Sequence, residues 1–177
     1  DITSSARLEK DGSYAIKGQK IFISGGDHEY CDNFIHLVLA RIEGAPAGTK
    51  GISLFVVPKN RFGESGTLEF NDVLTVGDFQ KMGQKGYCTT HLSFGESEDC
   101  EGWLVGEQNQ GLRYMFQMMN GARIDVGLTA ASTATAAYYA SLKYAKERPQ
   151  GRRISNGGKK NKAAPQTLII NHPDVRR

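Results

Sequence analysis

The sequence predicts an α+β protein: an antiparallel β-barrel or sandwich, followed by long helices that belong to an incomplete helical bundle. Two observations support this fold class. Short β-rich runs separated by turn residues occupy the chain up to about Gly106, and apolar residues recur at spacings of three and four after it. We therefore expect a β-domain over residues 1–106 and the first part of a helical domain over residues 107–177.

The expected strands are runs of β-formers bounded by turn residues. They cover residues 3–9, 14–17, 20–24, 34–42, 52–59, 73–76 and 89–94. The Asp11-Gly12 pair predicts a hairpin with a type I′ turn, which needs a positive φ at both central residues. A second turn is predicted at Gly18-Gln19, and long loops at residues 43–50 and 61–67.

Two helices are predicted in the second region. The first contains the apolar residues 112, 115, 116 and 119, and Gly121-Ala122 after it marks a break or a close approach. The second runs over residues 123–148, where Pro149 ends it. Its many small residues favour close packing inside a bundle whose other helices lie outside this chain. The sequence is therefore expected to be the middle piece of a larger protein. A basic, glycine-rich loop follows at residues 151–162, and Pro173 suits the first turn of another helix.

Composition excludes several classes of protein. The 177 residues are 39% hydrophobic and 23% charged, with a mean hydropathy of −0.43, which excludes disordered and fibrous chains. No apolar run approaches the ~20 residues of a membrane span, and a net charge of +3 does not by itself indicate a nucleic-acid or membrane partner. Three cysteines and four scattered histidines show no metal-ligand spacing, so no metal is expected and a reducing compartment, the cytoplasm, is favoured.

Motifs of known chemistry are few. No G-x-S-x-G, P-loop or dinucleotide G-x-G-x-x-G motif follows a strand and opens a helix, so hydrolase, nucleotide-triphosphatase and Rossmann functions lack support. Phe22 and Ser24 remain, because side chains two apart on a strand share a face. Such a pair offers an apolar wall and a hydrogen-bond donor to a planar heteroaromatic ligand. A core phenylalanine beside a serine is the commoner explanation of this pattern.

Five segments, in this order, carry a family resemblance. They are residues 17–24, residues 50–57, Lys81-Met82-Gly83, residues 104–107 with Gly111-Leu112, and residues 144–148. Together they resemble the acyl-CoA dehydrogenase family over essentially the whole chain. Further stretches at residues 118–123, 150–152 and 172–177 look like its bacterial branch acting on long-chain or 3-methylmercaptopropionyl thioesters.

The resemblance implies an FAD-dependent enzyme that oxidises an acyl-CoA to the trans-2-enoyl-CoA. Electrons would pass to an electron-transfer flavoprotein or a similar acceptor, and the full-length protein would be a homodimer or homotetramer. In this family a glutamate downstream of Arg177, or in some members at the position of Ala122, removes the α-proton. No catalytic residue is therefore assigned to this chain. Because the main flavin-binding segment would precede Asp1, this piece alone is expected to be inactive and to bind little FAD.

The resemblance also assigns binding residues by position. Cofactor contacts fall on Phe22, Ile23, Ser24, Arg148, Gln150 and His172, and contacts to the CoA arm on Asn120 and Arg123. Phe22 replaces a common tryptophan, which keeps an apolar wall but loses the indole N–H donor.

Arg148 has two explanations. Its guanidinium suits the cofactor pyrophosphate, because it donates two parallel hydrogen bonds to phosphate oxygens; alternatively, it is a cation at a helix C-terminus. On one helix, Arg123 and Arg148 would be ~37 Å apart, so they cannot serve one flavin ring. The resemblance implies that Arg148 contacts the cofactor of a neighbouring subunit.

Three alternatives stay open. An acyl-CoA oxidase would let oxygen reoxidise the flavin, and nothing in the sequence reports oxygen access. A nucleic-acid-binding, non-catalytic family relative would use the basic residues 159–162. A free-standing lipid- or acyl-binding β-barrel is the third, and the unpaired apolar stripe of the helical region argues against it.

Overall fold

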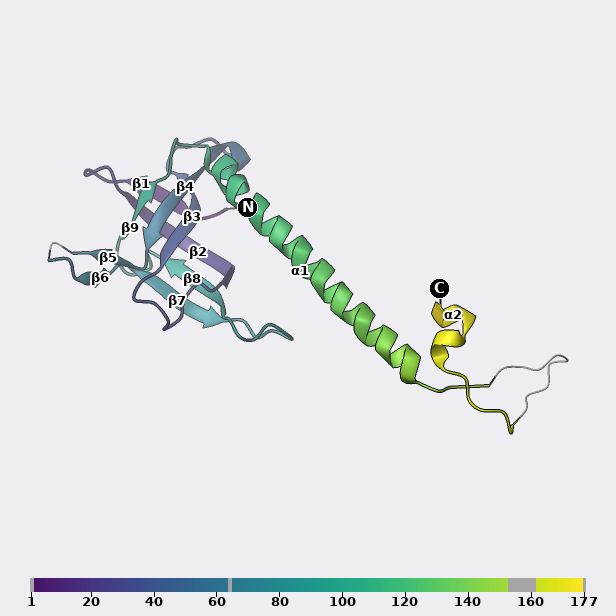
Figure 1. The fold of residues 1–177 in the computed structure, drawn as a ribbon. Helices are drawn as coiled ribbons and strands as arrows, with labels where there is room; N and C mark the ends of the chain where they lie inside the picture. The colour runs from purple at the N-terminus through teal and green to yellow at the C-terminus, as the bar shows by residue number, and fades with distance from the viewer. Residues whose placement is uncertain (1, 64, 153–161, 177) are drawn as a thin grey trace. The chain divides into compact units, whose positions relative to one another are not determined.

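The computed structural model describes residues 2–63, 65–152 and 162–176 (Figure 1). The chain divides into two compact units, Asp1–Met119 and Asn120–Arg177. The strands of the described residues lie in the first unit, and most of one long helix lies in the second. An α+β fold with a sheet-rich region followed by a long helix confirms the predicted fold class.

The first unit is built on a sheet that closes on itself. Its strands are β1 (Ser5–Leu8), β2 (Tyr14–Ser24), β3 (Ile35–Ile42), β4 (Ile52–Pro58), β5 (Asn60–Phe62), β6 (Leu68–Phe70), β7 (Val73–Asp78), β8 (Thr89–Phe94) and β9 (Cys100–Leu104). Seven of them form the order β1-β3-β4-β9-β2-β8-β7, and an added β1–β2 pairing closes a ring. The β1–β3 pair is parallel and the other pairs of this sheet are antiparallel. β5 and β6 form a separate hairpin.

The hydrophobic core is formed by residues of this ring together with β7 and β8. Its buried residues are Ala6, Tyr14, Ile16, Val38, Ala40, Phe55, Val57, Val73, Leu92, Phe94 and Cys100. The rings of Tyr14 and Phe55 meet edge to face, with centroids 5.0 Å apart. Burial, reinforced by the carboxylate of Asp72, raises the pKa of Cys100 to about 12. Its thiol therefore stays protonated and packs as a small apolar group.

β2 is one continuous strand, so the turn predicted at Gly18-Gln19 is wrong. Gly18 has a φ of +139°, and a Cβ on it would lie 2.8 Å from the Cα of Ser4. Only glycine tolerates both conditions. The strand stops pairing with β1 at Lys17 and starts pairing with β8 at Gly18. The glycine therefore marks where β2 passes from one set of neighbours to another.

The first hairpin is confirmed, but its turn is not type I′. Within the loop between β1 and β2, Gly12 has a positive φ of +90° and Asp11 does not. The loop has five residues, closed by a hydrogen bond from Glu9 N to Ser13 O at 2.9 Å. The carboxylate of Asp11 accepts hydrogen bonds from the amide and hydroxyl of Ser13, which stabilises this longer loop.

Two features of the sheet were missing from the expected strands. β5 extends into the region predicted as a loop at residues 61–67, and β6 begins directly after it. β9 was not predicted, because Glu101-Gly102 interrupts its apolar pattern. A Cβ on Gly102 would lie 2.9 Å from Cγ1 of Ile16 and 3.0 Å from Cγ2 of Val57. Close packing against β2 and β4, rather than propensity, therefore specifies β9.

α1 (Gly111–Glu147) is a single helix of 37 residues, so Gly121-Ala122 is not a break, and no described atom lies within 4 Å of a Cβ on Gly121 to make it a close approach. A lone glycine costs only ~1 kcal/mol in a helix interior. The helix ends before Arg148 and Pro149, as predicted. Apolar side chains such as Ile124, Val126 and Leu128 are exposed, which fits a helix whose packing partners are not among the described residues.

After α1 the chain forms η2 (Ile169–Asn171) and α2 (Pro173–Arg176), and Pro173 begins its helix as predicted. Residues 153–161 of the predicted basic loop lie outside the described residues. None of the described helices carries an apolar stretch long enough to cross a bilayer.

Candidate functional site

The strand segment that holds Phe22, Ile23 and Ser24 is bulged. Its register with β8 shifts between Lys20 and Ile23, and Phe22 has a φ of +58°, which is rare for a bulky residue. Phe22 is 63% exposed and Ser24 is exposed, whereas Ile23 packs against the core. Both side chains are accessible, but Ile21 is exposed as well and the bulge interrupts the alternation of the strand, so the shared face of Phe22 and Ser24 stays a prediction. Because Phe22 is exposed, the core-phenylalanine explanation is wrong.

Phe22 does not stand alone on this surface. Its ring lies 4.5 Å from the ring of Phe79, centroid to centroid, at a tilt of 34°. Phe79 follows β7 and is held by a hydrogen bond from its amide to Thr89 O. Sequence reasoning missed Phe79, although the neighbouring Lys81-Met82-Gly83 segment drew attention to this loop.

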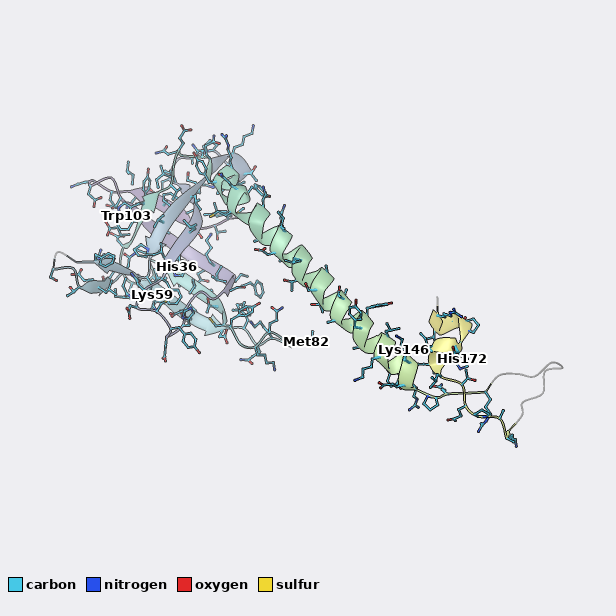
Figure 2. The ribbon with its side chains drawn as sticks, in the orientation of Figure 1. His36, Lys59, Met82, Trp103, Lys146 and His172 are labelled. Carbon is cyan, nitrogen blue, oxygen red and sulfur yellow. The ribbon has the colours of Figure 1, made fainter. Side chains whose placement is uncertain are left out.

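The loop between β7 and β8 is internally braced. The Lys81 ammonium donates to Tyr87 O at 2.7 Å and lies 3.5 Å from the centroid of the Tyr87 ring. Met82 is fully exposed in this loop (Figure 2). Ile21 of β2 and Val76 of β7 are also exposed apolar residues of this unit.

A pocket of about 260 Å³ opens beside Ser24. It is lined by Lys20, Ile23, Ser24, Gly25 and Gly26 on one side and by Phe34, Ile35, His36, Leu37, Val38, Leu92 and Phe94 on the other. Nε2 of His36 is buried without a hydrogen-bond partner. Burial lowers the pKa of His36, so the imidazole is neutral near pH 7 and can offer a hydrogen bond to a group in the pocket.

Lys20 connects the two strands that border this pocket. Its ammonium donates to Leu39 O at 2.7 Å, and burial lowers the pKa of Lys20. β2 and β3 do not pair with each other in the described sheet. The contact from Lys20 therefore crosses the open seam between them.

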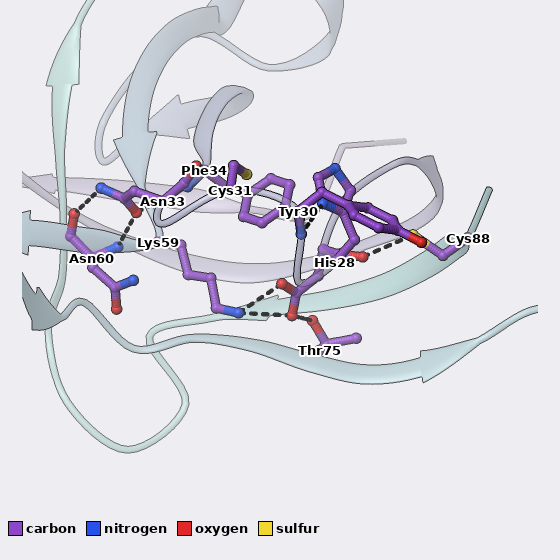
Figure 3. A network of polar contacts seen from close by, with 10 residues as sticks. His28, Tyr30, Cys31, Asn33, Phe34, Lys59, Asn60, Thr75 and Cys88 are labelled. Atoms are coloured by element: carbon purple, nitrogen blue, oxygen red, sulfur yellow. Dashed lines mark hydrogen bonds and ion pairs between the residues drawn. The ribbon is translucent and has the colours of Figure 1, made fainter.

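A polar cluster lies directly after Ser24 in the chain. The Asp27 carboxylate accepts hydrogen bonds from the Lys59 ammonium at 2.7 and 2.8 Å and from the Thr75 hydroxyl at 2.6 Å (Figure 3). Burial raises the pKa of Asp27, but the hydrogen bonds and the charge of Lys59 outweigh it, and the net pKa is lowered. Asp27 is therefore ionised at neutral pH. Sequence reasoning did not identify this cluster, because its members are distant in the chain.

In the second unit the structure brings Arg148, Gln150 and His172 together. Ile169 N donates to Arg148 O, and Gln150 N donates to Thr167 O, both at 2.9 Å. Nε2 of His172 lies 2.8 Å from Gln150 O and donates to it. These contacts fold the segment after α1 back onto the chain that carries Arg148.

Asn120 and Arg123 lie three residues apart on α1 and are exposed, so they share one side of the helix. Because α1 is continuous and Arg148 follows its last residue, the ~37 Å separation of Arg123 and Arg148 along the helix stands. Within the described residues no group of three His, Cys, Asp or Glu side chains is placed to hold a metal ion.

The fold defines the class of protein. An acyl-CoA dehydrogenase from Bacillus anthracis, solved in complex with FAD, is similar to this chain with a TM-score of 0.69 at 24% sequence identity. The match covers 99% of this chain and 25% of that one. The barrel and long helix are therefore those of the acyl-CoA dehydrogenase fold.

Sequence comparison identifies the family. The 3-methylmercaptopropionyl-CoA dehydrogenase of Ruegeria pomeroyi is 45% identical over 177 residues, which is 99% of this chain and 29% of that protein. A butyryl-CoA dehydrogenase of Syntrophomonas wolfei is 44% identical over 172 residues, 94% of this chain and 27% of that protein. No family model matches the chain.

The chain belongs to the acyl-CoA dehydrogenase family, which confirms the resemblance in the sequence. It spans less than a third of the length of these relatives.

Proposed function

We propose that the full-length protein is an FAD-dependent acyl-CoA dehydrogenase that oxidises an acyl-CoA thioester to the trans-2-enoyl-CoA. The observation that carries this proposal is the exposed Phe22–Phe79 pair beside Ser24 on the bulged end of β2. When bound, FAD supplies the hydride acceptor. The residues of this chain bind and orient its ring.

The residues present fit a flat, largely apolar ring. Phe22 keeps a strained, left-handed backbone conformation, which costs of order 1–3 kcal/mol, while leaving most of its side chain uncovered. Strain of this kind persists at ligand sites, because the surrounding structure holds it in place. Ser24 adds an exposed hydroxyl two residues further on, and Ile23 anchors the segment to the core.

Arg148, Gln150 and His172 are proposed to bind the cofactor away from its ring. Hydrogen bonds between residues 148–150 and residues 167–172 support this, because they hold the three side chains on one folded segment. The Arg148 guanidinium suits a pyrophosphate. Asn120 and Arg123 are assigned to the CoA arm of the substrate by the family resemblance. The ~37 Å between Arg123 and Arg148 along the helix supports a contact of Arg148 with the cofactor of a neighbouring subunit.

The remaining parts of the proposal concern the whole protein. We place the end of the β-domain at Gly106 and assign residues 107–177 to the helical domain. A homodimer or homotetramer is supported by the exposed apolar side chains of α1. An electron-transfer flavoprotein or a similar protein is the proposed acceptor. The free cysteines Cys31, Cys88 and Cys100 favour a reducing compartment, the cytoplasm.

An anaerobic titration tests the proposal. The visible absorbance of the full-length protein is followed while acyl-CoAs of several chain lengths are added. We expect a flavin band that one or more of them bleaches, and slow recovery when air is admitted. A protein that binds no flavin, or whose flavin no acyl-CoA bleaches, contradicts the proposal, and fast recovery in air with peroxide release indicates the oxidase instead.

A further inference from the structure

The chain between Ser24 and Asp27 is a tight turn that is tied down at both ends. Gly25 has a φ of +63°, and its amide donates to Cys88 O at 2.9 Å. Two residues later, the Cys88 thiol donates to Asp27 O at 2.8 Å. Both contacts attach the turn to the chain that leads into β8.

The middle of the turn is also fitted closely. A Cβ on Gly26 would lie 2.2 Å from Oγ1 of Thr90, and the same hydroxyl donates to Ile23 O at 3.2 Å. The backbone from Ile23 to Gly26 therefore has little room to shift as long as Thr90 and Cys88 hold their places.

The Asp27 carboxylate joins this turn to two other parts of the sheet. Lys59 follows the end of β4, and Thr75 belongs to β7. The three side chains meet in one cluster (Figure 3), with the Asp27 and Lys59 side chains only 22% and 27% exposed. A pair this sheltered is screened less by solvent than a surface ion pair.

We propose that Asp27, through its ion pair with Lys59 and its hydrogen bond from Thr75, is a positioning residue that fixes the Ser24 wall of the flavin site. This inference rests on the proposed function, since it concerns how the same wall is held. Removing one member of the ion pair leaves a sheltered charge without its partner. The residue 24–27 turn then shifts so that water can solvate this charge, and Ser24 shifts with it.

Substitutions in the full-length protein test this inference. In Asp27→Asn and Lys59→Met, we expect FAD affinity to fall at least about tenfold and kcat to fall about 10–100-fold, because small misplacements of a binding group have effects of that size. KM for the acyl-CoA should stay within about twofold, since the substrate contacts are elsewhere. The absorption band and reduction potential of the bound flavin should also shift. Lys59→Arg, which keeps the positive charge, should restore most of these properties.

Arg7→Met is the matched control. It breaks an ion pair with Glu9 and Asp99 in the same unit, on β1, with the arginine side chain 52% exposed. We expect its FAD affinity, flavin spectrum and kcat to equal those of the wild type.

Each outcome separates the inference from the proposed function. A wild-type protein that binds no FAD defeats the proposed function. A wild type that binds FAD, together with Asp27→Asn and Lys59→Met proteins that match it in affinity, spectrum and kcat, overturns the inference alone. If those two variants do not fold, Thr75→Val decides. This variant keeps the ion pair, and its affinity for FAD should fall about fivefold, the size expected for the loss of one hydrogen bond. An unchanged FAD affinity and flavin spectrum would overturn the inference.

Discussion

The two units of this chain are stabilised in different ways. The first contains a core of eleven buried side chains contributed by the strands of one seven-stranded sheet. In the second, Ala145 is the one buried residue among those described, and large apolar side chains along α1 face outward. The barrel thus contains most of the interactions that specify it, whereas the helix relies on partners outside the described residues. One amino-acid sequence can therefore encode a self-sufficient unit and a dependent one side by side.

Separating the units is the strongest way to break this comparison. We expect residues 1–119 to unfold in one cooperative thermal transition, because they carry the core cluster. Residues 120–177 alone should show no cooperative transition by circular dichroism, since most of their helical stability would come from tertiary packing. A cooperative transition in the second piece would show that α1 needs no partner.

Truncating one apolar side chain in each unit sharpens the contrast. In the 177-residue chain, Phe55→Ala should destabilise the barrel by ~3–5 kcal/mol, because Phe55 is 0% exposed. Ile124 is 73% exposed, so Ile124→Ala should change the unfolding free energy of the barrel by less than ~0.5 kcal/mol. Urea unfolding followed by the fluorescence of Trp103, the one tryptophan of the chain, measures both. Equal effects would contradict the difference between the units.

Glycine-to-alanine substitutions should have opposite signs in the two units. Gly18→Ala should cost ~1–3 kcal/mol, because it combines a φ of +139° with a clash against Ser4. Gly121→Ala should stabilise α1 by ~0.5–1 kcal/mol, since no atom lies within 4 Å of the new Cβ. Barrel unfolding reports the first change and the helical circular dichroism signal the second. A stabilising Gly18→Ala would exclude the close approach of β1 and β2 at this point.

The smallest expected effect concerns pH and is confined to the barrel. Burial lowers the pKa of His36, with the charge of Lys59 adding to it and that of Asp27 opposing it. The folded state therefore binds a proton less readily than the unfolded state, so barrel stability present above the ordinary histidine pKa of ~6.5 is lost as pH falls through that value toward the folded pKa.

In His36→Phe, whose ring can pack between Phe34 and Phe94, this loss should shrink. Unfolding of both proteins at about pH 7.5 and about pH 5.5, on either side of the ordinary histidine pKa, tests this. Identical losses in the two proteins would show that His36 is not the group responsible.

Sequence patterns predicted the strands whose apolar residues alternate or run continuously, such as β3, β4 and β8, and the end of α1 at Pro149. The sequence patterns failed at glycines, because a glycine can mark a turn or a break but can also sit inside a regular element. Gly18 resembles a turn residue but allows close strand contact, Gly102 conceals a strand, and Gly121 resembles a break but is simply tolerated. For Gly18 and Gly102 the deciding contact involves residues distant in the chain, which a local pattern does not contain, and for Gly121 no contact decides.

For the candidate site, the sequence singled out Phe22 and Ser24, which the structure leaves exposed, and the family resemblance indicated Arg148, Gln150 and His172, which lie on one hydrogen-bonded segment. The positive φ of Phe22, its ring contact with Phe79 and the Asp27–Lys59–Thr75 cluster could not be read from the sequence. They depend on a bulge and on the convergence of three strands, which tertiary packing determines.

The left-handed backbone at Phe22 combines a strained conformation with an exposed aromatic side chain at a single position. A glycine at position 22 would relieve the backbone strain of the bulge, so selection for thermal stability alone would favour it. The same substitution would remove the aromatic side chain. Engineers who seek heat-tolerant versions of this barrel by consensus or by scoring of folded-state energy should therefore leave position 22 untouched.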